Sequence, residues 1–140
     1  MSEWSQVAAS KYAKKQADDQ LTRELIANKS LPLFHFIIEK FQSEIDAFNT
    51  NSGREILHIQ CPSNHTACVV TRLGTNSTLL IGYDTICDEL RLKGEGGVLF
   101  EKNFTFKAEL YTKDVYLVED KHPINIDAEI AASLNAILGI

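Results

Sequence analysis

The sequence predicts an α+β fold of two layers, in which two N-terminal helices and one C-terminal helix cover one face of an antiparallel sheet. Three observations support this class. Apolar residues have helical spacing in the first third of the chain, alternate with polar residues in the middle, and return to helical spacing at the end. The turns between the alternating segments are too short for parallel crossovers. At 140 residues, we expect one globular domain over residues 1–140.

The first helix is predicted from Ser2, a possible N-cap, to Ile26. One side of this helix mixes apolar and polar residues. Its apolar members are Trp4, Val7, Ala8, Leu25 and Ile26, and the polar residues between them are Lys11, Lys15, Asp18 and Thr22. We expect this helix to dock on its own domain. The alternative is a projecting arm whose Trp4 contacts another surface.

A second helix is predicted after Ser30, which is a plausible N-cap, with Pro32 in its first turn, where a missing N–H costs nothing. Its apolar residues recur at steps of three and four: Phe34, Ile37, Ile38, Phe41, Ile45 and Phe48. Such a stripe requires burial. Asn and Gly in residues 49–53 accept left-handed backbone and end the helix.

Six segments alternate with a period of two, and we expect about five or six strands from them. They are residues 55–61, 67–72, 78–83, 89–93, 98–110 and 115–119. Short turns rich in Gly, Asn and Asp join successive segments as hairpins, which predicts an antiparallel meander. The segment 98–110 is long enough to hold a bulge or turn at its centre.

The closing helix is predicted after Pro123, with Asn125 as its N-cap and acidic residues in its first turn. Its apolar stripe consists of Ile126, Ile130, Leu134, Ile137 and Leu138. Gly139 is expected to end it.

Composition excludes several functions. A net charge of -5 without clustered Lys or Arg argues against nucleic-acid binding. No run approaches the roughly 20 apolar residues of a membrane span. The first residues lack a basic region followed by an apolar one, so we expect a cytoplasmic location.

Four residues suggest a zinc site by spacing: His58, Cys61, His65 and Cys68. Zinc needs donors that converge, and His58 and Cys61 lie three apart on a predicted strand, which directs them to opposite faces. Cys61 and Cys68 would also fit a cross-strand disulfide. We expect instead two ordinary half-buried thiols, because the cytosol keeps thiols reduced, and we expect no metal or cofactor.

Catalysis has weaker support, and we expect no enzymatic activity. Cys87 sits beside Asp88 with no nearby His. His35 interrupts an apolar helix and is more typical of a structural histidine. The acidic residues near the predicted turns, which are Asp84, Asp88, Glu89 and Glu95, are expected to be solvated.

Four phenylalanines define a possible apolar pocket between the second helix and the sheet: Phe34, Phe41, Phe104 and Phe106. The same residues are what any two-layer core requires. The leading hypothesis is therefore a non-enzymatic protein-interaction module of unknown role, or a homo-oligomer, that uses the exposed sheet face, the sheet edges or the N-terminal helix with Trp4. A carrier of a small apolar ligand is the alternative, and a zinc- or carboxylate-dependent enzyme is the least favoured one.

Overall fold

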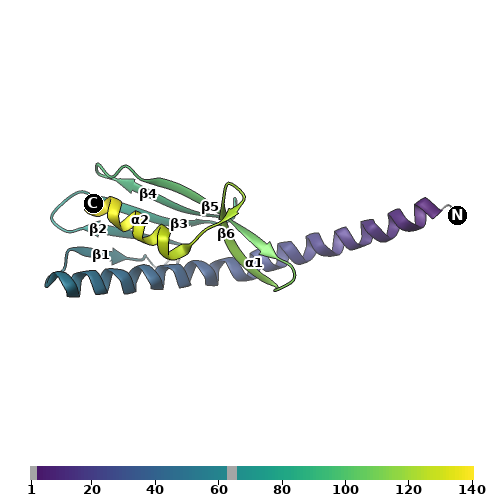
Figure 1. Ribbon diagram of the computed structural model, residues 1–140, viewed down its shortest axis with the longest axis horizontal. Coiled ribbons are helices and arrows are strands. Elements are labelled where there is room, and N and C mark those ends of the chain that lie inside the picture. Colours follow the sequence, from purple (N-terminus) through teal and green to yellow (C-terminus); the bar gives the residue numbers. More distant parts are fainter. Residues whose placement is uncertain (1–2, 63–65) are drawn as a thin grey trace.

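The computed structural model describes residues 3–62 and 66–140. A 50-residue helix α1 (Glu3–Ser52) lies along one side of an antiparallel sheet, and a short helix α2 (Ile126–Leu138) follows the last strand. Both helices cover the same face of the sheet (Figure 1). The α+β class and the two-layer arrangement predicted from the sequence are confirmed.

Over the described residues the sheet has seven strands in sequence order, and every neighbouring pair is antiparallel. The strands are β1 (Leu57–Gln60), β2 (Ala67–Arg72), β3 (Thr78–Asp84), β4 (Glu89–Glu95), β5 (Glu101–Glu109), β6 (Asp114–Glu119) and β7 (His122–Pro123). The predicted meander is therefore correct. The two-residue β7 was not predicted, because so short a pairing leaves no alternating pattern in the sequence.

The strand predicted over residues 98–110 begins only at Glu101. Gly96 and Gly97 adopt positive φ angles of 68° and 89°, and the Gly94 N–H donates to the Phe100 carbonyl at 2.7 Å. A Cβ atom on Gly96 would collide with the Asn76 carbonyl. These residues form the connection from β4 to β5, so the irregularity lies before the strand instead of at its centre.

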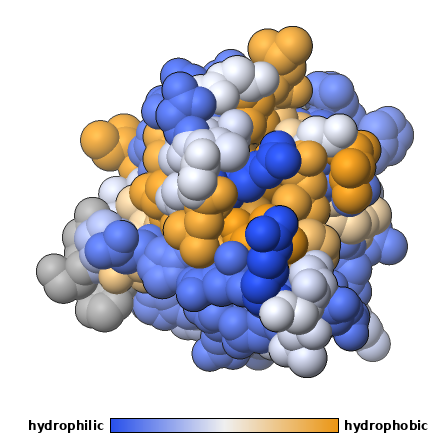
Figure 2. Space-filling view, turned by 90° about the vertical axis from the view of Figure 1, so that its left-hand side faces the viewer, coloured by the Kyte–Doolittle hydropathy of each residue, from blue (hydrophilic) through white to orange (hydrophobic). Residues whose placement is uncertain are grey.

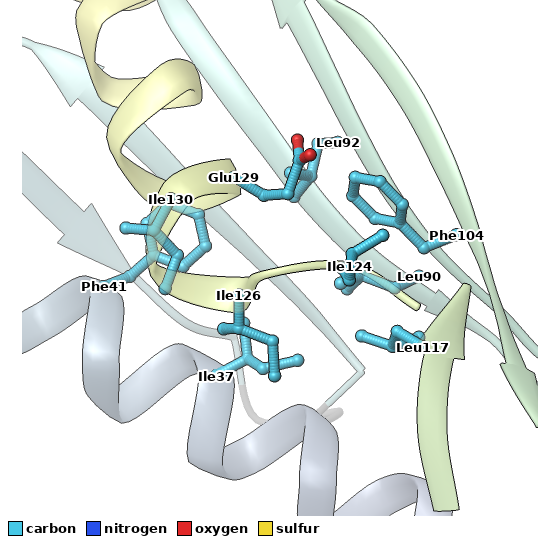
Figure 3. A pocket seen from close by; sticks show the side chains of 10 residues that line it. All are labelled: Ile37, Phe41, Leu90, Leu92, Phe104, Leu117, Ile124, Ile126, Glu129 and Ile130. Carbon is cyan, nitrogen blue, oxygen red and sulfur yellow. The ribbon is translucent and has the colours of Figure 1, made fainter. Parts of the chain in front are cut away.

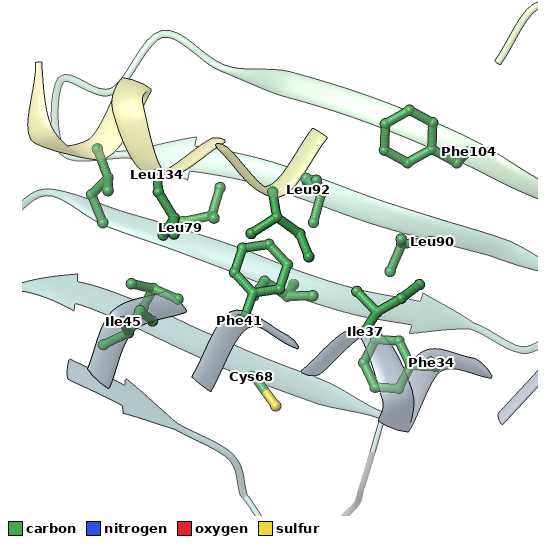
Figure 4. Close-up of a cluster of buried hydrophobic side chains, with 14 of the residues drawn as sticks. Phe34, Ile37, Phe41, Ile45, Cys68, Leu79, Leu90, Leu92, Phe104 and Leu134 are labelled. Carbon is green, nitrogen blue, oxygen red and sulfur yellow. The ribbon is translucent and has the colours of Figure 1, made fainter. Parts of the chain in front are cut away.

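One apolar core fills the space between the helices and the sheet (Figure 4). Phe34, Ile37, Phe41 and Ile45 of α1 project from one side of the helix onto the inward residues of the sheet, and each is at most 1% exposed. The inward residues of β2 to β5 include Val70, Leu79, Ile81, Leu90, Leu92, Phe104 and Phe106. Charged residues such as Arg91 and Lys93 alternate with them and face away from the core.

The prediction of two N-terminal helices is wrong, because α1 continues without a break from Glu3 to Ser52. Ser30 is a fully buried residue inside the helix and not an N-cap, and Pro32 is also inside it. A proline in a helix interior removes one backbone hydrogen bond and normally bends or ends the helix. Here the burial of Phe34, Ile37 and Phe41 on the same helix outweighs that cost.

Helix α2 matches its prediction in detail. The Asn125 side chain accepts a hydrogen bond from the Ala128 N–H at 3.1 Å, and Gly139 adopts the left-handed conformation that ends the helix.

Two lysines bind the first turn of α2. Lys40 of α1 donates to Asp127 at 2.8 Å, and Lys102 of β5 donates to Glu129 at 3.0 Å. The hydrogen bond to Glu129 raises the pKa of Lys102. The first turn of α2 is thus tied to both layers.

Candidate functional site: the α1 arm and the cleft at its base

Residues 3–20 of α1 extend beyond the rest of the molecule as a straight arm (Figure 1). The first buried side chain of the helix is Leu25. Before it, Trp4 is 77% exposed and Tyr12 65% exposed, and Val7 is also exposed. The expectation that this segment docks on its own domain is therefore wrong for residues 3–20. The segment projects as an arm, as in the alternative, while the contact of Trp4 with another surface stays a prediction.

The side-chain interactions of the arm join successive turns of the same helix. Gln16 donates to the Tyr12 hydroxyl at 2.8 Å, and Lys15 lies 3.9 Å from Asp19. Both pairs are exposed, and exposed pairs at this spacing add only about 0.2–0.5 kcal/mol each. Isolated helices shorter than about 12–15 residues are marginal in water, and the arm is only slightly longer than that. Because none of its side chains is buried, the arm lacks the tertiary packing that stabilises the rest of α1.

A cleft of about 490 Å³ lies where the arm joins the body, between α1, the start of β2 and the turn from β3 to β4. Its apolar part is formed by Ile26, Ala27, Leu31 and Tyr83. Its polar part consists of Thr22, Arg23, Thr66, Thr85 and Asp88. A volume of this size lies in the range of sites that hold small molecules or a large side chain.

Tyr83 forms a wall of this cleft and also packs on the core. Its ring lies 5.9 Å from that of Phe34 and 5.1 Å from that of Phe106, measured between centroids. Burial raises the pKa of Tyr83, and the nearby Asp88 carboxylate adds to the increase. At neutral pH the Tyr83 side chain is therefore uncharged, and it presents an apolar ring and a polar hydroxyl to the cleft.

The expectation of two free thiols at Cys61 and Cys68 is wrong, because the two residues form a disulfide. The register of β1 and β2 pairs Gln60 with Val69, so Cys61 follows directly opposite Cys68, with their Cα atoms 4.2 Å apart. Residues that face one another without backbone hydrogen bonds have about this separation. Cys87 is a free, exposed cysteine.

The zinc pattern is not assembled by the residues that the structure describes. The sulfur atoms of Cys61 and Cys68 are bonded to each other, and His58 is an exposed partner of Glu55 at 3.1 Å. His65 lies outside the described residues. Within residues 3–62 and 66–140, no three His, Cys, Asp or Glu side chains gather in an arrangement suited to a metal ion.

Of the acidic residues near the turn from β3 to β4, Asp84 stabilises that turn. Asp84 accepts hydrogen bonds from the N–H groups of Ile86 and Cys87 at 2.9 and 3.1 Å. Arg91 lies 2.9 Å from Asp84 and 3.6 Å from Glu89. The two backbone hydrogen bonds, and to a smaller extent the charge of Arg91, lower the pKa of Asp84. A carboxylate that is kept ionised in this way is poorly suited to act as a general acid.

The four phenylalanines considered for an apolar pocket are buried in the core. The space next to Phe41 and Phe104 measures only about 10 Å³, and the side chains of both helices and the sheet close around it (Figure 3). That is about the size needed for one water molecule. In this conformation the core has no room for an organic ligand at that position.

The end of the molecule opposite the arm carries a second apolar surface. Figure 2 shows apolar side chains there, surrounded and partly covered by polar ones. The β2–β3 turn, the β4–β5 connection and the C-terminus lie at this end (Figure 1). These segments contain three exposed large apolar residues: Leu73, Leu99 and Ile140. The connections are held together by bonds such as the one from the Ser77 hydroxyl to the Gly96 carbonyl, at 3.2 Å.

Comparison with protein-family models, curated proteins and solved structures finds no match for this chain. Among the helices in the described part of the chain, none has the length and apolar character required to cross a membrane. The arm and the cleft are therefore the features of the molecule that point to a function. Sequence reasoning identified Trp4 but missed the cleft, because its walls come from three separated segments whose proximity no local pattern reveals.

Proposed function

We propose that this protein is a non-enzymatic protein-interaction module that binds its partner through the arm, residues 3–20 of α1. The observation that carries the proposal is the exposure of Trp4, Val7 and Tyr12 on a helix that projects from the body. Tryptophan and tyrosine are enriched at protein interfaces, where they supply large and rigid contact surfaces. A projecting helix with such residues fits helix-in-groove recognition.

Two expectations from the sequence accompany this proposal. Nucleic acid is not the expected partner, because the net charge is -5 and the arm carries both signs of charge. The cytoplasmic location stays a prediction from the first residues of the sequence. The Cys61–Cys68 disulfide is more typical of oxidising compartments, so a fractionation experiment with thiol trapping is the direct test of location.

Site-specific photo-crosslinking tests the proposal. A benzophenone amino acid is placed at Trp4 or Tyr12 of the full chain, and in a control at Leu99, which is 99% exposed at the opposite end. We expect a single adduct of defined mass from the arm positions, with either a second copy or another protein, and we expect Val7→Asp to remove it. If the arm positions give no more adduct than Leu99, or if Val7→Asp leaves the adduct unchanged, the arm is not the binding element.

A further inference from the structure

We infer that the partner of the arm is a second copy of this chain, paired antiparallel, with Trp4 of each copy seated in the cleft of the other. This inference rests on the proposed function of the arm. It also accounts for the cleft at the base of the arm and for the polar residues that interrupt the apolar side of the helix.

The charges of the arm favour an antiparallel pair. Lys11, Lys14 and Lys15 form a positive block, and Asp18 and Asp19 follow as a negative block. In a parallel pair, the positive block of one copy would face the positive block of the other, and the negative blocks would also face each other. Like charges across an interface are unfavourable. In an antiparallel pair whose twofold axis passes between Gln16 and Ala17, Lys15 of one copy faces Asp18 of the other.

The same register makes the interrupted side of the helix self-complementary. It places Lys11 opposite Thr22 of the second copy, so each lysine on this side meets a polar or acidic side chain. Counting back from Lys15 in one copy and forward from Asp18 in the other brings Val7 level with Ile26. Apolar residues thus meet at the two ends of the contact, and charged residues fix the register in the middle.

Trp4 then arrives beside the cleft of the second copy. The register brings Trp4 level with Lys29, and the cleft is lined by α1 residues on both sides of that position, including Ile26 and Leu31. Its own cleft is beyond the reach of Trp4, because Ile26 lies about 33 Å farther along the same straight helix. The apolar walls suit the indole ring, and Thr85 and Asp88 provide acceptors for its N–H.

The contact area is compatible with a stable dimer. A standard interface buries about 1,600 Å² in total. Two tryptophan side chains bury about 300–500 Å² of that when fully enclosed. Both arms, each a helix of about 27 Å, and the surfaces that they cover supply the remainder. The exposed ion pairs contribute mainly orientation, since such pairs add little affinity.

A charge-swap experiment on the full chain tests the register. We expect light scattering to give twice the 15.7 kDa chain mass for the unaltered protein. Lys15→Asp or Asp18→Lys alone should raise the dissociation constant by more than about tenfold. The double variant, Lys15→Asp with Asp18→Lys, should restore the dimer, because the pair re-forms with reversed signs. The control is Glu24→Lys, which makes the same charge change on the opposite side of the helix and should leave the dimer intact.

The fluorescence of Trp4, the single tryptophan of the chain, provides a second readout. Its emission should be shifted to the blue in the dimer and return to that of solvent-exposed tryptophan on dilution. Tyr83→Ser in the cleft should shift the emission to the red at concentrations where the unaltered protein is a dimer. A monomer at all concentrations, or a double variant that stays monomeric, overturns the antiparallel pair. Arm crosslinks to a different protein would then preserve the proposed function while removing the second copy as partner.

Discussion

Residues 25–52 and residues 3–20 of α1 share one continuous helical backbone but differ in what surrounds them. The later part buries Phe34, Ile37, Phe41 and Ile45 against the sheet, whereas Trp4 and the other large apolar residues of the arm stay exposed. Both parts contain apolar residues at helical spacing. Spacing therefore indicates that a surface needs covering, but it does not say whether the covering element belongs to the same molecule.

Phe41→Ala should give the largest effect on stability. Phe41 is completely buried at the centre of the core, and truncating such a residue costs about 3–5 kcal/mol, because packing is lost and a cavity remains. The measurement is the free energy of unfolding from urea denaturation.

Tyr12→Ala is the matched control in the arm, where we expect a change within about 0.5 kcal/mol when the protein is monomeric. A similar loss for both variants would contradict the division of α1 into a packed part and a free part. The difference between the two losses in free energy of unfolding therefore measures how much more tertiary packing the later part of α1 has than the arm.

Most of the body could be predicted from the sequence, because its signals are local. Alternation located six of the seven strands, and Asn125 and Gly139 marked the ends of α2. The cysteine pair was harder, since its register allowed a disulfide while the expected compartment argued for free thiols. The position of Cys61 opposite Cys68 on paired strands indicated the bond correctly, and the expected compartment did not.

The errors in α1 have one physical origin. Ser30 and Pro32 look like the start of a helix, and local preferences favour a break there. The structure continues the helix because tertiary burial on its later part outweighs these preferences. The same reasoning explains why the cleft was missed, since Ile26 and Tyr83 are far apart in sequence and meet only after folding.

Pro32→Ala should have the next largest effect, and in the stabilising direction. If Pro32 is inside one continuous helix, alanine restores a backbone N–H and should increase the free energy of unfolding by about 1–3 kcal/mol. If a helix began at this proline, the missing N–H would be unimportant and the substitution would be close to neutral. The measurement is again urea denaturation, with a circular dichroism spectrum to confirm that helix content does not fall.

Ala13→Gly in the arm should have the smallest effect on global unfolding. Glycine lowers helix propensity by about 1 kcal/mol, but the arm has no buried side chain through which this loss would reach the core. For the monomer we expect reduced helical signal and an unchanged urea midpoint.

Ala131→Gly, at an exposed position of α2, is the matched comparison and should lower the free energy of unfolding by about 1 kcal/mol. In the dimer the result for Ala13→Gly should change, because a paired arm is linked to the folded body of the second copy and its helix loss then weakens the assembly. An urea midpoint that falls for Ala13→Gly only at high protein concentration would connect the order of the arm to its partner. A midpoint that falls equally at every concentration would mean that the arm is stabilised by its own body.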